Sequence, residues 1–337
     1  MKEVYARFAL WSELRVEPLI NTLGPYFDEI PVDPIDGSSV EVIRGKKARV
    51  ARRSIAGFRA VSLSFDPDRV RSKRILDQEL HVVLSAASAI YAGTVRAEAR
   101  AKRLIHNLKT LTAKTSQEIF LVFQQNRMLD APKEVVEYLS AEVLKFPQET
   151  AKAVVEVLKH QSAQKAEYSA FEKLAGNIQS IKPEAHEVHR VLMNVFYLFF
   201  ADFLDKKVWV NVEPTRVQGL FDYDAIHACI YYLVDNAAKY CSPSTRLEVS
   251  VSVKDALVDI SFEMESLFIP AGEQDIIFEE GISGSVASKK DLHGAGLGLF
   301  LAREMARLNG GRLNLLAGRV ARGDYSRNTF VLTLPCA

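Results

Sequence analysis

Cysteine is scarce in this chain of 337 residues, which has only Cys229, Cys241 and Cys336. These three residues are scattered, and their separations match no metal-binding spacing. Scattered cysteines are typical of a reducing compartment, where disulfides do not persist. The first expectation is therefore an intracellular protein that folds around packed cores, and the length is sufficient for two or three domains.

An excess of charge of either sign is also missing. The chain has 43 basic and 42 acidic residues, a net charge of +1. This balance gives no electrostatic reason to expect a nucleic acid or a membrane surface as partner. One local exception is the basic run R-G-K-K-A-R-V-A-R-R at residues 44–53. Such a run is more often a solvated face than an anion-binding patch, so nucleic-acid binding is not expected.

Long unbroken apolar runs are absent as well. The stretch from Val191 to Leu204 is shorter than the roughly 20 residues of a membrane span, and Asn194 and Asp202 interrupt it. No signal peptide pattern precedes the first expected strand. We therefore expect a cytoplasmic protein without a membrane partner, whose input signal arrives from the cytoplasm or through another protein.

A glycine-rich segment is the most informative feature that the chain does contain. Residues 292–301 have the sequence L-H-G-A-G-L-G-L-F-L, and Gly294, Gly296 and Gly298 alternate with other residues. An apolar helical pattern follows through Met305 and Leu308. Glycines let the backbone approach a ligand closely, and the free N–H groups at a helix N-terminus favour a phosphate chain. A tight turn before a core helix is the alternative interpretation.

A second motif lies about 60 residues earlier, in I-Y-Y-L-V-D-N-A-A-K-Y at residues 230–240. The apolar residues form one stripe at helical spacing, and Asn236, Lys239 and Tyr240 share the opposite side. An amide oxygen can complete a Mg²⁺ shell that phosphate oxygens and water already occupy, and a lysine one turn later can meet the phosphate charge. An ordinary amphipathic helix with a polar face is the alternative.

The order of these motifs resembles the GHKL-type ATP-binding domain of sensor histidine kinases. Strand patterns at residues 208–212, 247–253, 257–262 and 330–334 complete the resemblance, which covers the chain from about Lys182 onward. Residues 277–281 look like the family's F box, and the small, polar segment that follows predicts a lid over the nucleotide. The resemblance implies a Bergerat-type α/β sandwich that binds Mg·ATP, with Asn236 as the Mg²⁺ ligand. It implies nucleotide-binding roles for Asn236, Lys239, Tyr240, Gly294, Gly296, Leu297 and Gly298.

The segment from Arg103 to Thr110 looks like the H box of the same family. The resemblance makes His106 the phosphoryl acceptor, since a neutral imidazole has a free lone pair for attack on the γ-phosphorus. Most relatives follow this histidine with Glu or Asp, but here the neighbour is Asn107, which accepts a hydrogen bond without neutralising the imidazolium. Slower chemistry is the expected consequence. Thr110 shares the helix face of His106 and resembles the residue that positions water for phosphatase activity.

The flanking pattern predicts a long helical hairpin. Apolar residues at spacings of three and four run from Leu76 to Val122, and a second helical run covers residues 131–174 with an interruption near Phe146-Pro147. We interpret the first stripe as the seam of a dimeric four-helix bundle. The predicted fold is α+β and multidomain: a small N-terminal α+β module at 1–72 in the position of a sensor, a dimerisation and histidine phosphotransfer domain at 73–180, and an ATP-binding catalytic domain at 181–337.

The largest departure from the family lies at its first glycine box, normally Asp-x-Gly-x-Gly followed by Ile-Pro. Alignment on Ile269 and Pro270 places Met264 at the position of the adenine-binding aspartate. A thioether is a poor acceptor for the adenine amino group. Either Glu263 or, as we predict, Glu265 takes this role through a shift of register; otherwise the pocket binds ATP weakly, binds another nucleotide or is empty. Tyr232 is a second departure, since relatives often have a polar or acidic residue there.

Three functions remain in order of preference. The first is a soluble, homodimeric histidine protein kinase of two-component signal transduction, which transfers phosphate from Mg·ATP to His106 and then to an aspartate of a separate response regulator. The second is a degenerate kinase-like scaffold or phosphotransfer adaptor with little or no ATP binding. The third is an ATP-gated conformational switch without histidine modification. Nucleotide affinity and the need for His106 distinguish the three.

Overall fold

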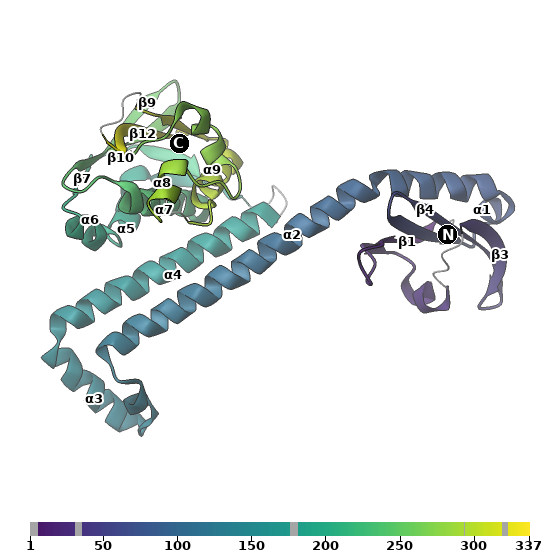
Figure 1. Ribbon diagram of the computed structural model, residues 1–337, viewed down its shortest axis with the longest axis horizontal. Coiled ribbons are helices and arrows are strands. Elements are labelled where there is room, and N and C mark those ends of the chain that lie inside the picture. The colour runs from purple at the N-terminus through teal and green to yellow at the C-terminus, as the bar shows by residue number, and fades with distance from the viewer. Residues whose placement is uncertain (1–5, 31–35, 176–180, 293, 319–322) are drawn as a thin grey trace. The chain divides into compact units, whose positions relative to one another are not determined.

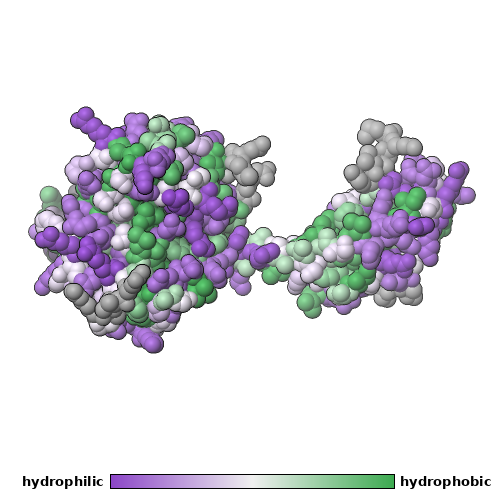
Figure 2. Space-filling model, turned by 90° about the horizontal axis from the view of Figure 1, so that it is seen from above, coloured by the Kyte–Doolittle hydropathy of each residue, from purple (hydrophilic) through white to green (hydrophobic). Residues whose placement is uncertain are grey.

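The structure is a computed structural model that describes residues 6–30, 36–175, 181–292, 294–318 and 323–337. The chain forms two compact units, Met1–Lys102 and Arg103–Ala337 (Figure 1). We describe each unit by itself. On the face shown in Figure 2, hydrophobic side chains lie among the hydrophilic ones on both units.

The first unit is built on a five-stranded antiparallel sheet with the strand order β2-β1-β5-β4-β3. Its strands are β1 (Arg7–Ser12), β2 (Ile20–Asn21), β3 (Gly37–Ile43), β4 (Lys46–Ile55) and β5 (Phe58–Ser64). One core packs around Trp11, whose ring stacks on Phe27 of the 3-10 helix η1 (Gly24–Glu29) at 5.8 Å between centroids. A short helix α1 (Pro67–Arg71), capped by Asp66, leads to the long helix α2 (Lys73–Val122). The expected mixture of strands and helix in this region is confirmed.

The first part of α2 covers this sheet. Leu76, Leu80, Leu84 and Ala87 of the helix are buried in one cluster with Leu10, Ala51 and Ala60 of the strands. The interpretation of the apolar stripe of α2 as a bundle seam is therefore wrong for the beginning of the helix. Apolar residues at spacings of three and four show that one face of a helix is buried. They do not show what covers that face, because a sheet can cover it as well as another helix can.

One helix among the described residues, α2, is long and apolar enough to cross a membrane by length and composition alone, with a window of mean hydropathy 1.2. The expectation that no segment qualifies is therefore wrong on this criterion. The segment from Leu80 to Val95 contains no Asp, Glu, Lys or Arg, although Ser, Gly and Thr interrupt its apolar residues. The sheet of the first unit covers one face of this segment through Leu80, Leu84 and Ala87.

The basic run at residues 44–53 is used largely within the first unit. Arg44 pairs with Glu29, Arg52 with Glu41 at 3.4 Å, and Arg53 with Asp77 at 3.1 Å. Arg49 donates to the Val70 carbonyl and to the Ser38 hydroxyl. These contacts give the run a structural role in the first unit, and the absence of a nucleic-acid partner stays a prediction.

The second unit begins with a helical hairpin. After α2 the chain turns through η2 (Gln125–Leu129), α3 (Pro132–Lys145) and α4 (Pro147–Ala175), and α4 runs beside the end of α2 (Figure 1). Gln164 of α4 donates to the Thr112 hydroxyl of α2 at 3.3 Å, which joins the two helices. The predicted interruption at Phe146-Pro147 is confirmed, because Phe146 leaves helical geometry before Pro147 starts α4. Pairing of two hairpins into a dimeric bundle stays a prediction.

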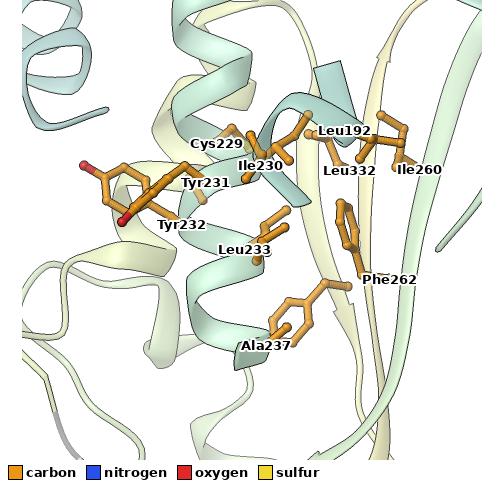
Figure 3. Packing of buried hydrophobic residues seen from close by; sticks show 14 of the residues in the cluster. Leu192, Cys229, Ile230, Tyr231, Tyr232, Leu233, Ala237, Ile260, Phe262 and Leu332 are labelled. Carbon is orange, nitrogen blue, oxygen red and sulfur yellow. The ribbon is translucent and has the colours of Figure 1, made fainter. Parts of the chain in front are cut away.

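The C-terminal part is a two-layer α/β sandwich. Its sheet has the order β11-β12-β10-β9-β7, with β7 parallel to β9 and the other pairs antiparallel. Helices α5, α7 and α9 cover one face, and their packing is visible where Leu233 and Ala237 of α7 approach Phe262 (Figure 3). The strands are β6 (Glu184–Glu187), β7 (Trp209–Val212), β8 (Gln218–Phe221), β9 (Arg246–Lys254), β10 (Leu257–Leu267), β11 (Arg312–Leu316) and β12 (Tyr325–Pro335). The helices are α5 (Val188–Phe196), α6 (Phe200–Asp205), α7 (Tyr223–Tyr240), α8 (Ser285–Lys289) and α9 (Gly298–Leu308).

A buried histidine makes the stability of this domain depend on pH. Burial lowers the pKa of His227 to about 4, and Lys165 adds to the effect. The unfolded chain binds a proton below about pH 6.5 while the folded chain does not, so folding is destabilised as the pH falls from about 6.5 to 4. We expect a loss of up to about 3 kcal/mol across this window. Urea unfolding at several pH values should show a flatter dependence in His227→Gln than in a variant of an exposed histidine, His106→Gln; equal slopes would contradict the assignment.

Candidate nucleotide site

The second unit contains a cavity of about 240 Å³ at the end of α7. Its walls come from α7, from the end of β10, from the 3-10 helix η5 (Ile276–Phe278) and from the loop that contains Gly294–Gly298. Helices α2 and α4 each contribute one residue, Asn107 and Glu167. The cavity therefore joins the glycine segment and the asparagine helix that the sequence singled out.

Asn236 lies on α7 where this helix faces the glycine loop. Helix α7 starts at its cap Asp222, which accepts from the Ala225 N–H, and the helical spacing then directs Asn236 to the cavity. The Nδ2 atom of Asn236 is buried and has no hydrogen-bond partner among the described residues. A Cβ added at Gly298 would lie 3.6 Å from this atom, so the loop approaches the amide closely. An orphaned amide beside a helix N-terminus suits a ligand that carries phosphate.

Lys239 and Tyr240 also line the cavity, but both have partners within the protein. The Lys239 ammonium pairs with Asp235 one turn earlier on α7. The Tyr240 hydroxyl donates to the Leu292 carbonyl at 3.2 Å and so ties the end of α7 to the loop before the glycines. Asp235 was not predicted as a site residue, and it lines the same cavity. A ligand phosphate would compete with Asp235 for Lys239.

Gly296 and Gly294 differ in how closely other atoms of the protein approach them. Gly296 has φ +66°, and a Cβ there would lie 2.6 Å from backbone atoms of Gly281 and Ile282. The Gly281 N–H donates to the Gly296 carbonyl at 3.1 Å, so the end of the predicted F box rests directly on the loop. Gly294, by contrast, has no atom within 4 Å of such a Cβ. Leu297 lines the cavity and precedes α9, whose N-terminus faces it.

The wall from β10 follows the alternation of a strand. Met264 and Ser266 are buried and line the cavity, while Glu263 and Glu265 lie on the other face of the strand. Glu263 pairs with Arg327 of β12 on that face. The prediction that Glu265 contributes to nucleotide binding is therefore wrong. The pairing of β10 with its neighbours is regular, so no shift of register turns the Glu265 carboxylate toward the cavity.

A buried amide supports this wall from behind. Asn328 of β12 is fully buried and donates to the Ser266 hydroxyl at 2.9 Å and to the Leu267 carbonyl at 3.1 Å. Its oxygen accepts from the Gly318 N–H and from the Ser326 hydroxyl. Sequence reasoning missed this group, because only the pairing of β12 with β10 places Asn328 behind the cavity.

The residues predicted to serve in phosphotransfer lie on α2, and one of them reaches the cavity. His106 is exposed and is not among the lining residues, whereas its neighbour Asn107 is. The Thr110 hydroxyl donates to the His106 carbonyl at 3.0 Å. Burial raises the pKa of Glu167, an effect opposed by the nearby Asn107 amide and Tyr232 hydroxyl. Glu167 has no local signal in the sequence, since it reaches the site only because α4 packs on α7.

A family model described as "Histidine kinase-, DNA gyrase B-, and HSP90-like ATPase" matches residues 221–337. Residues 221–337 of the C-terminal domain are thus similar to this ATPase family. The similarity implies that the domain binds ATP, and the matched range contains Asn236 and the glycine loop. The predicted GHKL-type sandwich is thereby confirmed.

Proteins with similar sequences and structures include histidine kinases. The chain is 25% identical over 156 residues to "Signal transduction histidine-protein kinase ArlS" of Staphylococcus aureus (strain USA300), which covers 43% of this chain and 33% of ArlS. The chain thus matches about a third of the length of this curated relative. The mycobacterial sensor histidine kinase MprB shares 20% identity and a TM-score of 0.40, covering 46% of this chain and 98% of that structure. Full-length ShkA in complex with AMPPNP shares 16% identity and a TM-score of 0.44, and the match covers 71% of this chain and 46% of the ShkA chain.

Proposed function

We propose that this protein is a histidine protein kinase that autophosphorylates His106 from Mg·ATP and passes the phosphoryl group to an aspartate of a separate response regulator. The observation that carries the proposal is the composition of the cavity wall. An ATPase cavity contains Asn107, and the residue before it is an exposed histidine on the same helix. Successive residues of an α-helix point about 100° apart, so His106 would reach the cavity only if α2 turned by about this angle relative to the ATPase domain. Such a rearrangement is the conformational step that the proposed transfer requires.

The residues of the cavity have distinct roles in this proposal. The glycine loop and the N-terminus of α9 hold the phosphates, and Lys239 meets their charge after leaving Asp235. The described residues include no group of three or more His, Cys, Asp or Glu side chains that would hold a metal ion by themselves. Mg²⁺ would therefore be held mainly by phosphate oxygens, with the amide oxygen of Asn236 as its protein ligand, and would neutralise phosphate charge.

The remaining parts of the proposal follow from the same assignment. His106 acts as nucleophile, Asn107 orients its imidazole and Thr110 positions water for phosphatase activity. Two copies pair through the hairpin, whose Ile105, Leu121 and Leu144 are exposed hydrophobic side chains. The first compact unit extends to Lys102, so the domain limit predicted at residue 72 is wrong. A domain limit at residue 180 and a sensory role for the N-terminal module belong to the proposal. So does a cytoplasmic location, since part of the apolar segment of α2 already packs on its own sheet.

Labelling with γ-phosphate from Mg·ATP tests this function. The purified wild-type chain should take up acid-labile, base-stable label, as a phosphoimidazole does, and both His106→Gln and Asn236→Ala should lower the uptake at least about 1000-fold. The exposed histidine His81 provides a matched control, because His81→Gln removes an imidazole from the first unit. That variant should label like the wild type.

The other outcomes separate the alternative functions. Label that survives in His106→Gln would contradict His106 as acceptor. Nucleotide binding without label would favour an ATP-gated switch. No detectable binding at millimolar ATP would favour a scaffold, for which the methionine at position 264 is the supporting observation.

A further inference from the structure

The two central strands of the C-terminal sheet give the cavity a wall with very little polarity. The lining residues that β10 and β12 supply are Met264, Ser266, Leu267 and Phe330. Of these described residues Ser266 alone is polar. The phosphate-binding features, Asn236 and the glycine loop, belong to other walls. A flat purine base fits against this sheet wall, because its apolar faces need burial away from the phosphates.

The single polar side chain of the sheet wall is held in place from behind. Asn328 Nδ2 donates to Ser266 Oγ at 2.9 Å and to the Leu267 carbonyl at 3.1 Å. The Asn328 oxygen accepts from Gly318 N and Ser326 Oγ, which fixes the orientation of the amide. Ser266 Oγ therefore accepts one hydrogen bond and keeps its proton and a second lone pair. A hydroxyl in this state can donate to a ligand or accept from it.

A group that only accepts hydrogen bonds is missing from the described part of the sheet wall. The carboxylates of Glu263 and Glu265 face the other side of β10, and Met264 presents a thioether, a weak acceptor, that is 4% exposed. At this wall, an acceptor aimed at the 6-amino group would select adenine over a 6-oxopurine, because a 6-carbonyl would leave that acceptor unpaired. A hydroxyl pairs with either group and therefore imposes no such penalty.

We propose that the cavity takes purine nucleoside triphosphates without distinguishing a 6-amino from a 6-oxo base. The proposal rests on the nucleotide-binding function proposed above and concerns its substrate class. Ser266 donates to the carbonyl oxygen of inosine or guanosine nucleotides and accepts from the amino group of adenosine nucleotides. The cavity does not select adenine because Met264 presents a thioether, a weak acceptor, instead of a carboxylate.

Displacement of fluorescent TNP-ATP from the full chain by Mg·ATP and by Mg·ITP tests this inference, because the two competitors differ only at the 6-position and its neighbouring ring nitrogen. The wild type should bind the two within about threefold of each other, since a hydroxyl pairs with either base. Met264→Asp should prefer ATP by at least about tenfold, because a carboxylate accepts from the amino group and is left facing the carbonyl oxygen of inosine. Met264→Leu is the matched control and should keep the wild-type ratio.

Each other result has a definite meaning. A wild-type preference for ATP above about tenfold overturns this inference and leaves the kinase proposal intact. Failure of both nucleotides to displace the probe at millimolar concentration overturns both proposals. Ser266→Ala provides a test that is independent of the folding of Met264→Asp, since it should weaken ATP and ITP by the same factor within about twofold. A loss confined to one nucleotide would contradict the dual role of the hydroxyl.

Discussion

Gly296→Ala is expected to weaken binding of Mg·ATP by about 100-fold, equivalent to about 2.7 kcal/mol. The reason is geometric, because Gly296 has φ +66° and an added Cβ would lie 2.6 Å from backbone atoms of Gly281 and Ile282. Neither backbone segment can yield without moving the start of the lid away from the glycine loop. A left-handed conformation adds about 1 kcal/mol of strain for alanine. Fluorescence titration with TNP-ATP measures the change.

Gly272→Ala is the matched control, at a glycine of the same domain that does not line the cavity. An added Cβ at Gly272 has no atom within 4 Å, and its φ lies outside the left-handed region. We expect this variant to bind within about twofold of the wild type, since it adds neither a clash nor strain. Thermal unfolding of both variants separates a local loss of the site from a general loss of structure. Equal binding by the two alanine variants would refute the role assigned to Gly296.

The elements of the ATPase domain were predictable because local patterns specify them. The expected hairpin at residues 247–253 and 257–262 became β9 (Arg246–Lys254) and β10 (Leu257–Leu267). The continuation of β10 past Phe262 was not predicted, since residues 263–270 were assigned to a glycine box. The alternation of Phe262, Met264 and Ser266 was nevertheless present in the sequence, and it places Glu265 outward. In this case the period-two pattern was a better guide than the alignment with the family.

Other parts of the site depend on tertiary packing and had no local signal. The stripe of α2 shows that one face is buried but not whether a sheet or a helix covers it, and the structure places Leu76 and Leu84 on the sheet of the first unit. Glu167 reaches the cavity through the packing of α4 on α7, and Asn328 through the pairing of β12 with β10. Such contacts join residues far apart in the chain, so periodicity within one element cannot predict them.

The buried carboxylate of Asp222 joins three segments of the second unit. Its Oδ2 accepts from the Lys173 ammonium at 2.9 Å and from the Lys182 N–H at 3.0 Å, and its Oδ1 caps α7 through Ala225. The Asp222 N–H donates to Asn309 at 2.7 Å. Burial by itself would raise the pKa of Asp222, but the hydrogen bonds and the nearby ammonium lower it. The carboxylate thus stays ionised where α4, α7 and the end of α9 meet.

Asp222→Ala is therefore expected to destabilise the second unit by about 4 kcal/mol, of which the lost helix cap accounts for about 1 kcal/mol. The larger part arises because the ammonium of Lys173, whose side chain is only 8% exposed, loses this carboxylate in a largely buried position. Asp224→Ala is the matched control, since Asp224 pairs with Lys165 at 2.7 Å with both side chains about half exposed. Its cost should stay below about 1 kcal/mol in urea unfolding. The double variant Asp222→Ala, Lys173→Met should recover part of the loss, because it removes the ammonium together with the carboxylate. If Asp222→Ala costs no more than Asp224→Ala, the buried pair does not hold α4 to the ATPase domain, and another contact must align Asn107 with the cavity.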